Sequence, residues 1–86
     1  MRVMVIEHFK DAAGVYRRFD ERGRMMPEGV QFVDSWVDAS LKRCFQLMDC
    51  ESIEQLEEWA ANWADLVDFE FVPVVGSAEA RKAILA

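Results

Sequence analysis

The chain has 86 residues, 52% of them hydrophobic and 30% charged, which is typical of one globular domain over residues 1–86 and excludes a disordered chain. The net charge of -6 argues against a phosphate-binding surface for DNA or RNA. The apolar run Val3–Ile6 near the start is too short for a signal sequence or a membrane span. We therefore expect a cytoplasmic protein with neither a nucleic-acid nor a membrane partner.

Few residues of the chain are suited to holding a metal or a nucleotide. Cys44 and Cys50 are six residues apart, and the chain has one histidine and no CxxC or HxxxH spacing. Structural zinc needs more ligands than these, and two cysteines in a small chain are not a disulfide framework. The four glycines are dispersed and form no phosphate-binding loop. We expect two free thiols, no metal and no cofactor.

The first half of the chain predicts a strand followed by a helix. Apolar and β-branched residues dominate Arg2–Phe9, as in a strand. Asp11 is suited to cap a helix whose apolar stripe includes Val15 and Phe19, and Gly23 is suited to end it.

Two strands joined by a hairpin are predicted next. They cover Val30–Asp38 and Lys42–Asp49, and Ala39–Leu41 is short enough to be the loop between them. The pairs expected from this loop are Trp36 with Cys44, Asp34 with Gln46 and Val33 with Leu47.

The second half predicts a helix, a strand and a terminal helix. Ser52 begins a capping-box pattern ahead of apolar residues at helical spacing, so a helix is expected over Ser52–Ala64. Val67–Val75 alternates between apolar and acidic residues, as in a strand, and Pro73 favours a place at the sheet edge. Ser77 is suited to cap a short terminal helix that ends at about Leu85.

This order, βαββαβ with a C-terminal helix, predicts an α+β, ferredoxin-like fold with a four-stranded antiparallel sheet and two helices on one face. The opposite face should then alternate apolar and polar residues cleanly, but the strands carry apolar residues on both faces. We expect a homodimer that packs sheet against sheet. A monomer with scattered surface apolar residues is the alternative.

Four segments resemble the domain of unknown function 3303 family across nearly the whole chain. They are MVIEHF (Met4–Phe9), YRRFDERGRMMPEG (Tyr16–Gly29), DSWVDASLKRCFQLM (Asp34–Met48) and WADLVDFEFVPVV (Trp63–Val75). The resemblance implies the dimeric α/β-barrel superfamily, whose ferredoxin-like subunits pair through their sheets. It implies no activity, because that superfamily contains cofactor-free monooxygenases, isomerases, haem-degrading enzymes and non-enzymatic sensory modules.

His8 is the natural candidate for a general base, since it is the only histidine. If the even-numbered positions of three strands share a face, His8 lies with Asp34 and Gln46, and the three form a possible proton-transfer set. The alternative is that they are hydrogen-bonded polar residues of a dimer interface.

A ligand pocket is the other candidate site. Trp36, Trp59 and Trp63 are possible aromatic walls, although the last two are also spaced like ordinary core residues of a helix. Arg24 is a possible anchor for an anionic ligand.

Three functions remain open from the sequence. The first is a module that binds or senses a small organic molecule in a pocket between sheet and helices. The second is a cofactor-independent oxygenase or isomerase with His8 as base, and the third is a purely structural interaction dimer. A cavity is needed for the first two, and His8 only for the second.

Overall fold

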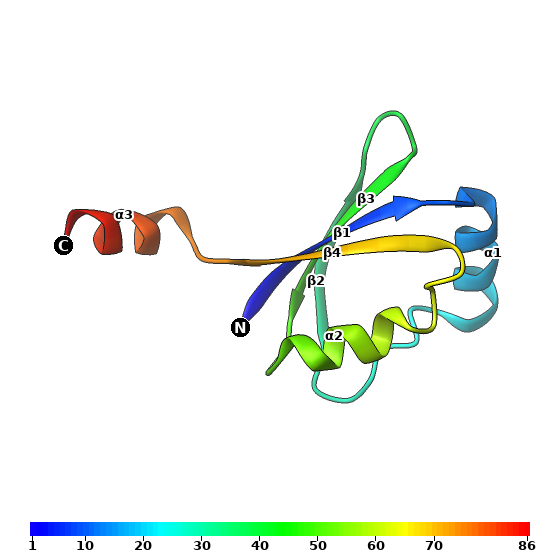
Figure 1. Ribbon diagram of the computed structural model, residues 1–86, viewed down its shortest axis with the longest axis horizontal. Coiled ribbons are helices and arrows are strands. Elements are labelled where there is room, and N and C mark those ends of the chain that lie inside the picture. Colours follow the sequence, from blue (N-terminus) through cyan, green and yellow to red (C-terminus); the bar gives the residue numbers. More distant parts are fainter.

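A computed structural model describes all 86 residues as a four-stranded antiparallel sheet with three helices. In chain order the elements are β1 (Arg2–Phe9), α1 (Ala12–Arg22), β2 (Gln31–Val37), β3 (Arg43–Asp49), α2 (Ile53–Ala60), β4 (Val67–Val74) and α3 (Ser77–Leu85). The strand order is β2-β3-β1-β4 (Figure 1). The predicted ferredoxin-like α+β fold is confirmed, and β4 with its proline lies at an edge.

The predicted helix ends are confirmed, apart from the length of α2 and the cap of α3, which is Gly76 rather than the expected Ser77. The Asp11 carboxylate accepts the Gly14 N–H at 3.0 Å, and Gly23, with φ of 67°, donates its N–H to the carbonyl of Phe19. Helix α2 begins after Ser52 but ends at Ala60 rather than at residue 64, because the next hydrogen bonds span three residues and form turns.

The hairpin between β2 and β3 differs from the prediction by one residue. Asp38 donates its N–H to the Arg43 carbonyl at 2.8 Å, so four residues form the loop, with Leu41 in a left-handed conformation at φ 64°. The expected pairs are wrong; those observed are Trp36 with Phe45, Val37 with Cys44, Ser35 with Gln46 and Asp34 with Leu47. Because side chains alternate along a strand, this shift exchanges the faces of one strand relative to the other.

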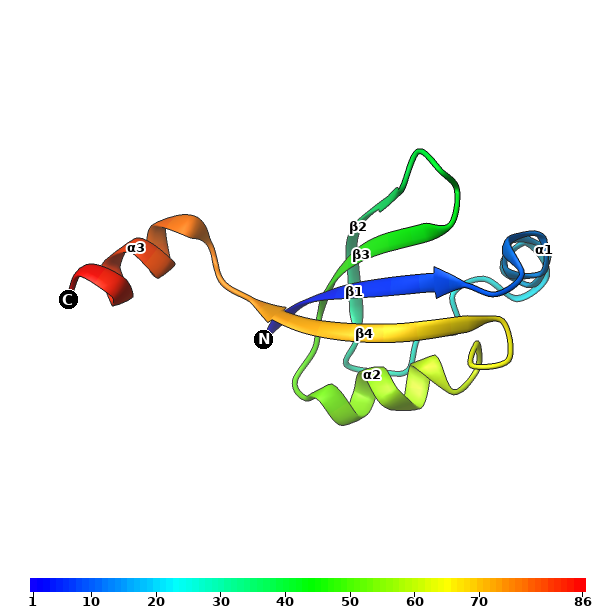
Figure 2. The same cartoon turned by 45° about the horizontal axis from the view of Figure 1, so that its top comes forward.

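The core lies between one face of the sheet and the layer of α1 and α2 (Figure 2). Its largest fully buried side chains come from β1, β3, β4 and α2: Trp59, Met48, Leu56, Val3, Val5 and Val67. Helix α1 contributes Val15 and lies toward the end of the sheet. Each such aliphatic or aromatic side chain stabilises the fold by about 1.5–3 kcal/mol through burial.

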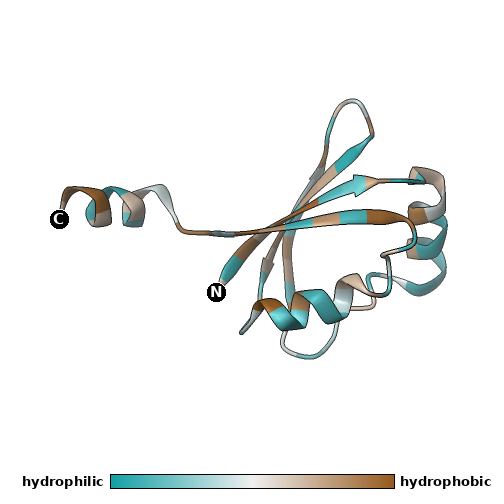
Figure 3. Cartoon of the chain, viewed as in Figure 1, coloured by the Kyte–Doolittle hydropathy of each residue, from teal (hydrophilic) through white to brown (hydrophobic).

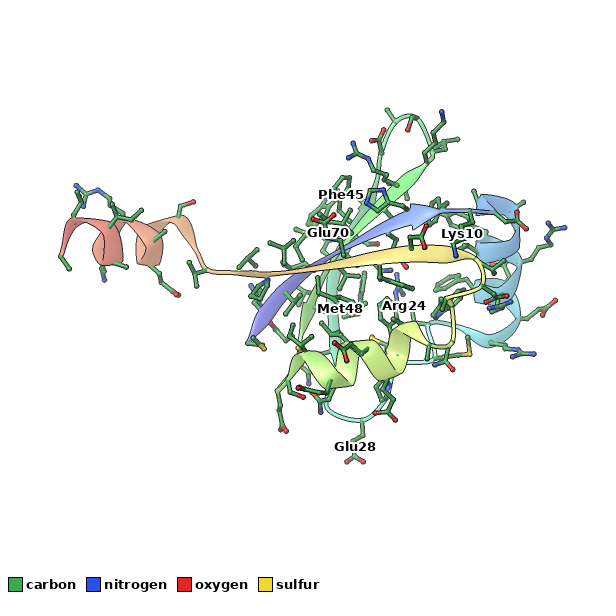
Figure 4. The ribbon with its side chains drawn as sticks, in the orientation of Figure 1. Lys10, Arg24, Glu28, Phe45, Met48 and Glu70 are labelled. Carbon is green, nitrogen blue, oxygen red and sulfur yellow. The ribbon has the colours of Figure 1, made fainter.

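The opposite face of the sheet, here called the open face, has no helix over it (Figure 2). Its apolar side chains include Met4, Ile6, Trp36, Phe45, Leu47, Val72 and Val74. Phe45 and Met48 of the same strand lie on opposite sides of the sheet (Figure 4). Trp36 is 51% exposed.

Helix α3 projects away from the sheet, and hydrophobic residues lie near its end (Figure 3). Ile84 is 79% exposed and Leu85 is 66% exposed. None of the helices combines the length and the hydrophobicity of a membrane span.

Candidate functional site

A partly open cavity of about 130 Å³ lies between the sheet and the two helices that cover it. Its floor comes from the inward-facing positions of β1, β2 and β3, and its walls from α1, α2 and the segments that follow each helix. Eight of its 12 lining residues are hydrophobic. Tyr16 and Val37 line the cavity and remain 48% and 38% exposed, so the mouth lies near them.

Glu7 is the polar centre of the cavity floor. It follows Val3 and Val5 on the inward face of β1 and is only 4% exposed. One carboxylate oxygen, Oε2, accepts a hydrogen bond from Gln46 Nε2 at 2.7 Å. Burial raises the pKa of Glu7, although the hydrogen bond from Gln46 acts in the opposite direction.

Gln46 connects Glu7 to Arg24. Its Oε1 accepts a hydrogen bond from Arg24 Nε at 3.3 Å, while its Nε2 donates to the carboxylate. The Arg24 guanidinium carbon lies 3.7 Å from the ring centre of Phe32 and 5.0 Å from that of Phe19. Figure 4 shows Arg24 on the α2 side of the sheet. The two aromatic rings therefore hold the cation in place without an acidic partner.

No nitrogen or hydroxyl donates to the second oxygen of Glu7, Oε1, and the other donor to this carboxylate is the weakly donating thiol of Cys44. Every side-chain nitrogen or oxygen that is fully shut off from solvent does have a partner. Oε1 must therefore be accessible, and the cavity that Glu7 lines is where it is accessible. The cavity thus contains one unused acceptor on a residue that is otherwise buried.

The two tryptophans of the α2 segment provide apolar walls. Trp59 and Trp63 both donate their indole N–H to the carbonyl oxygen of Arg24, at 2.7 and 3.2 Å. Their only polar atoms are thereby used within the protein, so they present ring surfaces to the cavity. The same bonds tie the backbone at Arg24 to α2 and to the turn after it.

Cys44 lies directly opposite Glu7 in the paired strands and also lines the cavity. Burial, with the neighbouring negative charge of Glu7, raises the pKa of Cys44 to about 12. The group is a neutral thiol at physiological pH and a poor nucleophile. Cys50 is likewise free and buried.

The three residues of the predicted proton-transfer set do not lie together. Gln46 faces the cavity, whereas His8 and Asp34 lie on the open face. His8 Nε2 is 3.6 Å from Glu70 Oε1, and both side chains are about half exposed. The assumption that even-numbered positions share a face is wrong, because Gln46 pairs with Val5 in the register of β1 and β3.

The predicted pocket residues divide between the two faces. Trp59, Trp63 and Arg24 line the cavity, while Trp36 is exposed on the open face. Sequence reasoning missed Glu7, although a signal was present. Glu7 is in phase with Val3 and Val5, at an inward position of a strand. A charged group is rarely buried at such a position, because its burial is costly unless it is paired or hydrogen-bonded.

The comparison with known families agrees with the resemblance seen in the sequence. The family described as "Domain of unknown function (DUF3303)" matches residues 1–86. The chain belongs to this family. Neither the curated proteins nor the solved structures provide a significant match. The function must therefore be argued from the cavity itself.

Proposed function

We propose that this protein is a binding or sensing module for a small organic molecule, which occupies the cavity between the sheet and the helices. The observation that carries the proposal is the Oε1 atom of Glu7, which faces the cavity without a strong donor on a side chain only 4% exposed. A carboxylate oxygen in a mostly apolar cavity is poorly solvated, and a bound molecule that donates a hydrogen bond reduces that cost.

The construction of the cavity supports this proposal. Ligand sites are concave and mostly apolar, with a few fixed polar groups that orient the ligand. Here the walls include Trp59 and Trp63, and the polar groups are Glu7, Gln46 and Arg24. Each is held by a hydrogen bond or by stacking on an aromatic ring, so little side-chain freedom is lost when a ligand enters.

The proposal includes a homodimer of the dimeric α/β-barrel type, formed through the open face. The centre of that face is apolar, with Ile6, Phe45 and Leu47, as in the buried centre of an interface. Each end carries both signs of charge: Arg2 pairs with Asp49 at one end, and Arg43 pairs with Asp38 at the other. A second copy turned about a two-fold axis meets complementary charges, which favours self-association over an unrelated partner.

A cofactor-independent oxygenase or isomerase is the second candidate. The observation in its favour is again Glu7, a carboxylate that faces a cavity and whose pKa burial raises, as a general base requires. In this version Glu7 replaces His8 as the base, because His8 lies on the other face of the sheet.

Nuclear magnetic resonance tests the proposed function directly, because the three tryptophans report on different places. A set of small aromatic and aliphatic compounds is titrated into the labelled protein while the three indole N–H signals are followed. We expect compounds that shift the signals of Trp59 and Trp63, which line the cavity, and leave that of Trp36 in place.

Two results would contradict the proposed binding site. If no compound shifts Trp59 or Trp63 at millimolar concentration, or if shifts are confined to Trp36, the cavity is not a binding site. A structural dimer is then the remaining function. If a compound binds in the cavity and is also converted, the enzymatic candidate replaces the binding module.

A further inference from the structure

The size of the cavity limits its ligand to about one ring. An engineered apolar protein cavity of about 150 Å³ holds one benzene molecule. The present cavity, at about 130 Å³, has a similar capacity, and its partly open mouth leaves room for a small substituent. A fused ring system or a nucleotide is too large to be enclosed by this cavity.

The walls select an aromatic body. Trp59 and Trp63 offer ring surfaces without free donors, since both indole N–H groups already bind the Arg24 carbonyl. Phe9 and Phe19 add further ring surface. Aromatic pairs gain about 0.5–1.5 kcal/mol beyond the burial of their area. A flat ring therefore gains more here than an aliphatic chain of the same volume.

The floor selects a hydrogen-bond donor. Both polar atoms of the Gln46 side chain are used, one by Glu7 and one by Arg24. The neutral thiol of Cys44 is at best a weak donor. Two groups of the floor remain: the Ser35 hydroxyl, which donates or accepts equally well, and the charged Glu7 Oε1, which only accepts when the carboxyl is ionised.

The charges of the site select a neutral ligand. A carboxylate ligand is repelled by Glu7 and attracted by Arg24, and an ammonium ligand the reverse, so the two charges offset each other for either ion. Neither ion then recovers the cost of leaving water for a mostly apolar cavity, a cost that a neutral hydroxyl does not carry. It also accepts a hydrogen bond while it donates one, and the Ser35 hydroxyl lines the same cavity without a hydrogen bond to the protein.

From these four constraints we propose that the ligand is a neutral, single-ring aromatic alcohol of the phenol class, whose hydroxyl donates to Glu7 Oε1 while its ring packs against Trp59 and Trp63. This assignment rests on the proposed function, because it names the chemistry of the molecule in the same cavity.

Calorimetric titration of the wild-type protein at neutral pH tests the assignment with four probes of one ring each. They are phenol, anisole, benzoate and benzylamine. Anisole keeps the ring and the oxygen but has no hydrogen to donate. We expect phenol to bind, and anisole to bind at least about tenfold more weakly, the effect of one hydrogen bond to a charged acceptor. Benzoate and benzylamine should also bind at least about tenfold more weakly, because each leaves water as an ion and meets repulsion from Glu7 or from Arg24.

Two matched variants locate the interaction. Glu7→Gln replaces the charged acceptor with a neutral one, so phenol affinity should fall about tenfold, whereas benzoate affinity should rise because the repelling charge is gone. Glu70→Gln makes the same change on the open face, where the carboxylate is exposed. It should leave the affinity for every probe within about twofold, the range of a change far from the site.

The outcomes separate the assignment from the function on which it rests. If benzoate, benzylamine or anisole binds wild-type protein as tightly as phenol, the assignment is overturned while the cavity remains a binding site. If none of the probes binds and other compounds do, the assignment is again wrong alone. If no compound of any kind binds in the cavity, both are wrong. Should Glu7→Gln not fold, the comparison of phenol with anisole on the wild-type protein still decides.

Discussion

Replacing Gln46 by leucine should destabilise the protein by about 3 kcal/mol at neutral pH. The change removes the donor to Glu7 Oε2 at 2.7 Å and the acceptor for Arg24 Nε at 3.3 Å. Hydrogen bonds to charged groups contribute about 1.5–3 kcal/mol each. Arg24 is only half-buried and can turn to water, so most of the loss comes from Glu7, which is left buried and unpaired.

The structure also predicts how a second change reverses this loss. In the double variant Glu7→Leu with Gln46→Leu, no charge remains to be desolvated, and stability should return to within about 1 kcal/mol of the wild type. Phenol binding should nevertheless be absent from the double variant. That combination of normal stability and lost binding would show that the polar pair serves the ligand rather than the fold.

The sign of the pH dependence follows from the direction of the Glu7 shift. Burial raises the pKa of Glu7 in the folded state, and the hydrogen bond from Gln46 limits that rise. The Gln46→Leu variant should therefore regain stability as the pH falls and Glu7 becomes protonated, and lose it again as the pH rises through the raised pKa. Cys44 and Tyr16, which also face Glu7, stay neutral over this range.

Thermal and urea unfolding followed by circular dichroism measure these differences. For a domain of this size, 3 kcal/mol corresponds to a decrease in Tm of roughly 15 °C. Gln31→Leu is the matched control, since Gln31 is exposed on β2 and should change stability by less than about 0.5 kcal/mol. A loss below about 1 kcal/mol in Gln46→Leu, or a double variant no more stable than the single one, would refute the reasoning.

Four further predictions follow from other parts of the structure. Phe45→Glu on the open face should convert a dimer of twice 9.9 kDa into a monomer in light scattering, and a wild-type monomer would contradict the interface. The Arg18 guanidinium holds the pKa of Asp65 at about 2. Arg18→Gln should therefore move the pKa of Asp65 toward 3.8, as a titration by nuclear magnetic resonance would record. This ion pair adds stability above pH 3.8 that is lost as the pH falls through 2. Both buried thiols should resist iodoacetamide in the folded protein at pH 8 and react after unfolding, as mass spectrometry would record; rapid labelling of folded Cys44 would contradict its pKa of about 12. His8→Ala should leave phenol affinity within about twofold in calorimetry, since His8 lies on the open face, and a larger loss would place it at the site.

Local signals in the sequence were sufficient for most of the fold. The bounds of β1 and of α3 agree with the structure, because a compact apolar strand and a helix after Gly76 depend little on distant contacts. The caps at Asp11 and Gly23 agree for the same reason, since each acts within four residues. The edge position of β4 followed from the missing amide of Pro73.

The hairpin register could not be obtained in that way. It depends on whether three or four residues form the loop, and Leu41 gives no sign in the sequence that it adopts a left-handed conformation. The Asp38 side chain bonds the Ser40 N–H and Arg43, and these contacts close the longer loop. One residue of error was enough to place Asp34 on the same face as Gln46.

The candidate site was predicted only in part, because it also depends on contacts between distant segments. Trp59 and Trp63, which were expected as possible walls of a pocket, both line the cavity because helical spacing places them on one side of α2 and its continuation. Arg24 was singled out by its position in a turn, but its stacking on Phe32 is a contact between distant segments. Glu7 was not predicted, because its neighbour His8 is the only histidine and the more obvious general base. Side chains alternate along a strand, so His8 points to the other face.

A crystal structure of the protein grown with phenol would test the central claim most directly. We predict electron density for one ring in the cavity, between the sheet and Trp59 and Trp63, with its oxygen about 2.7 Å from Glu7 Oε1. Density confined to the open face, or a cavity that contains only water at saturating phenol, would contradict the claim that this cavity is the functional site.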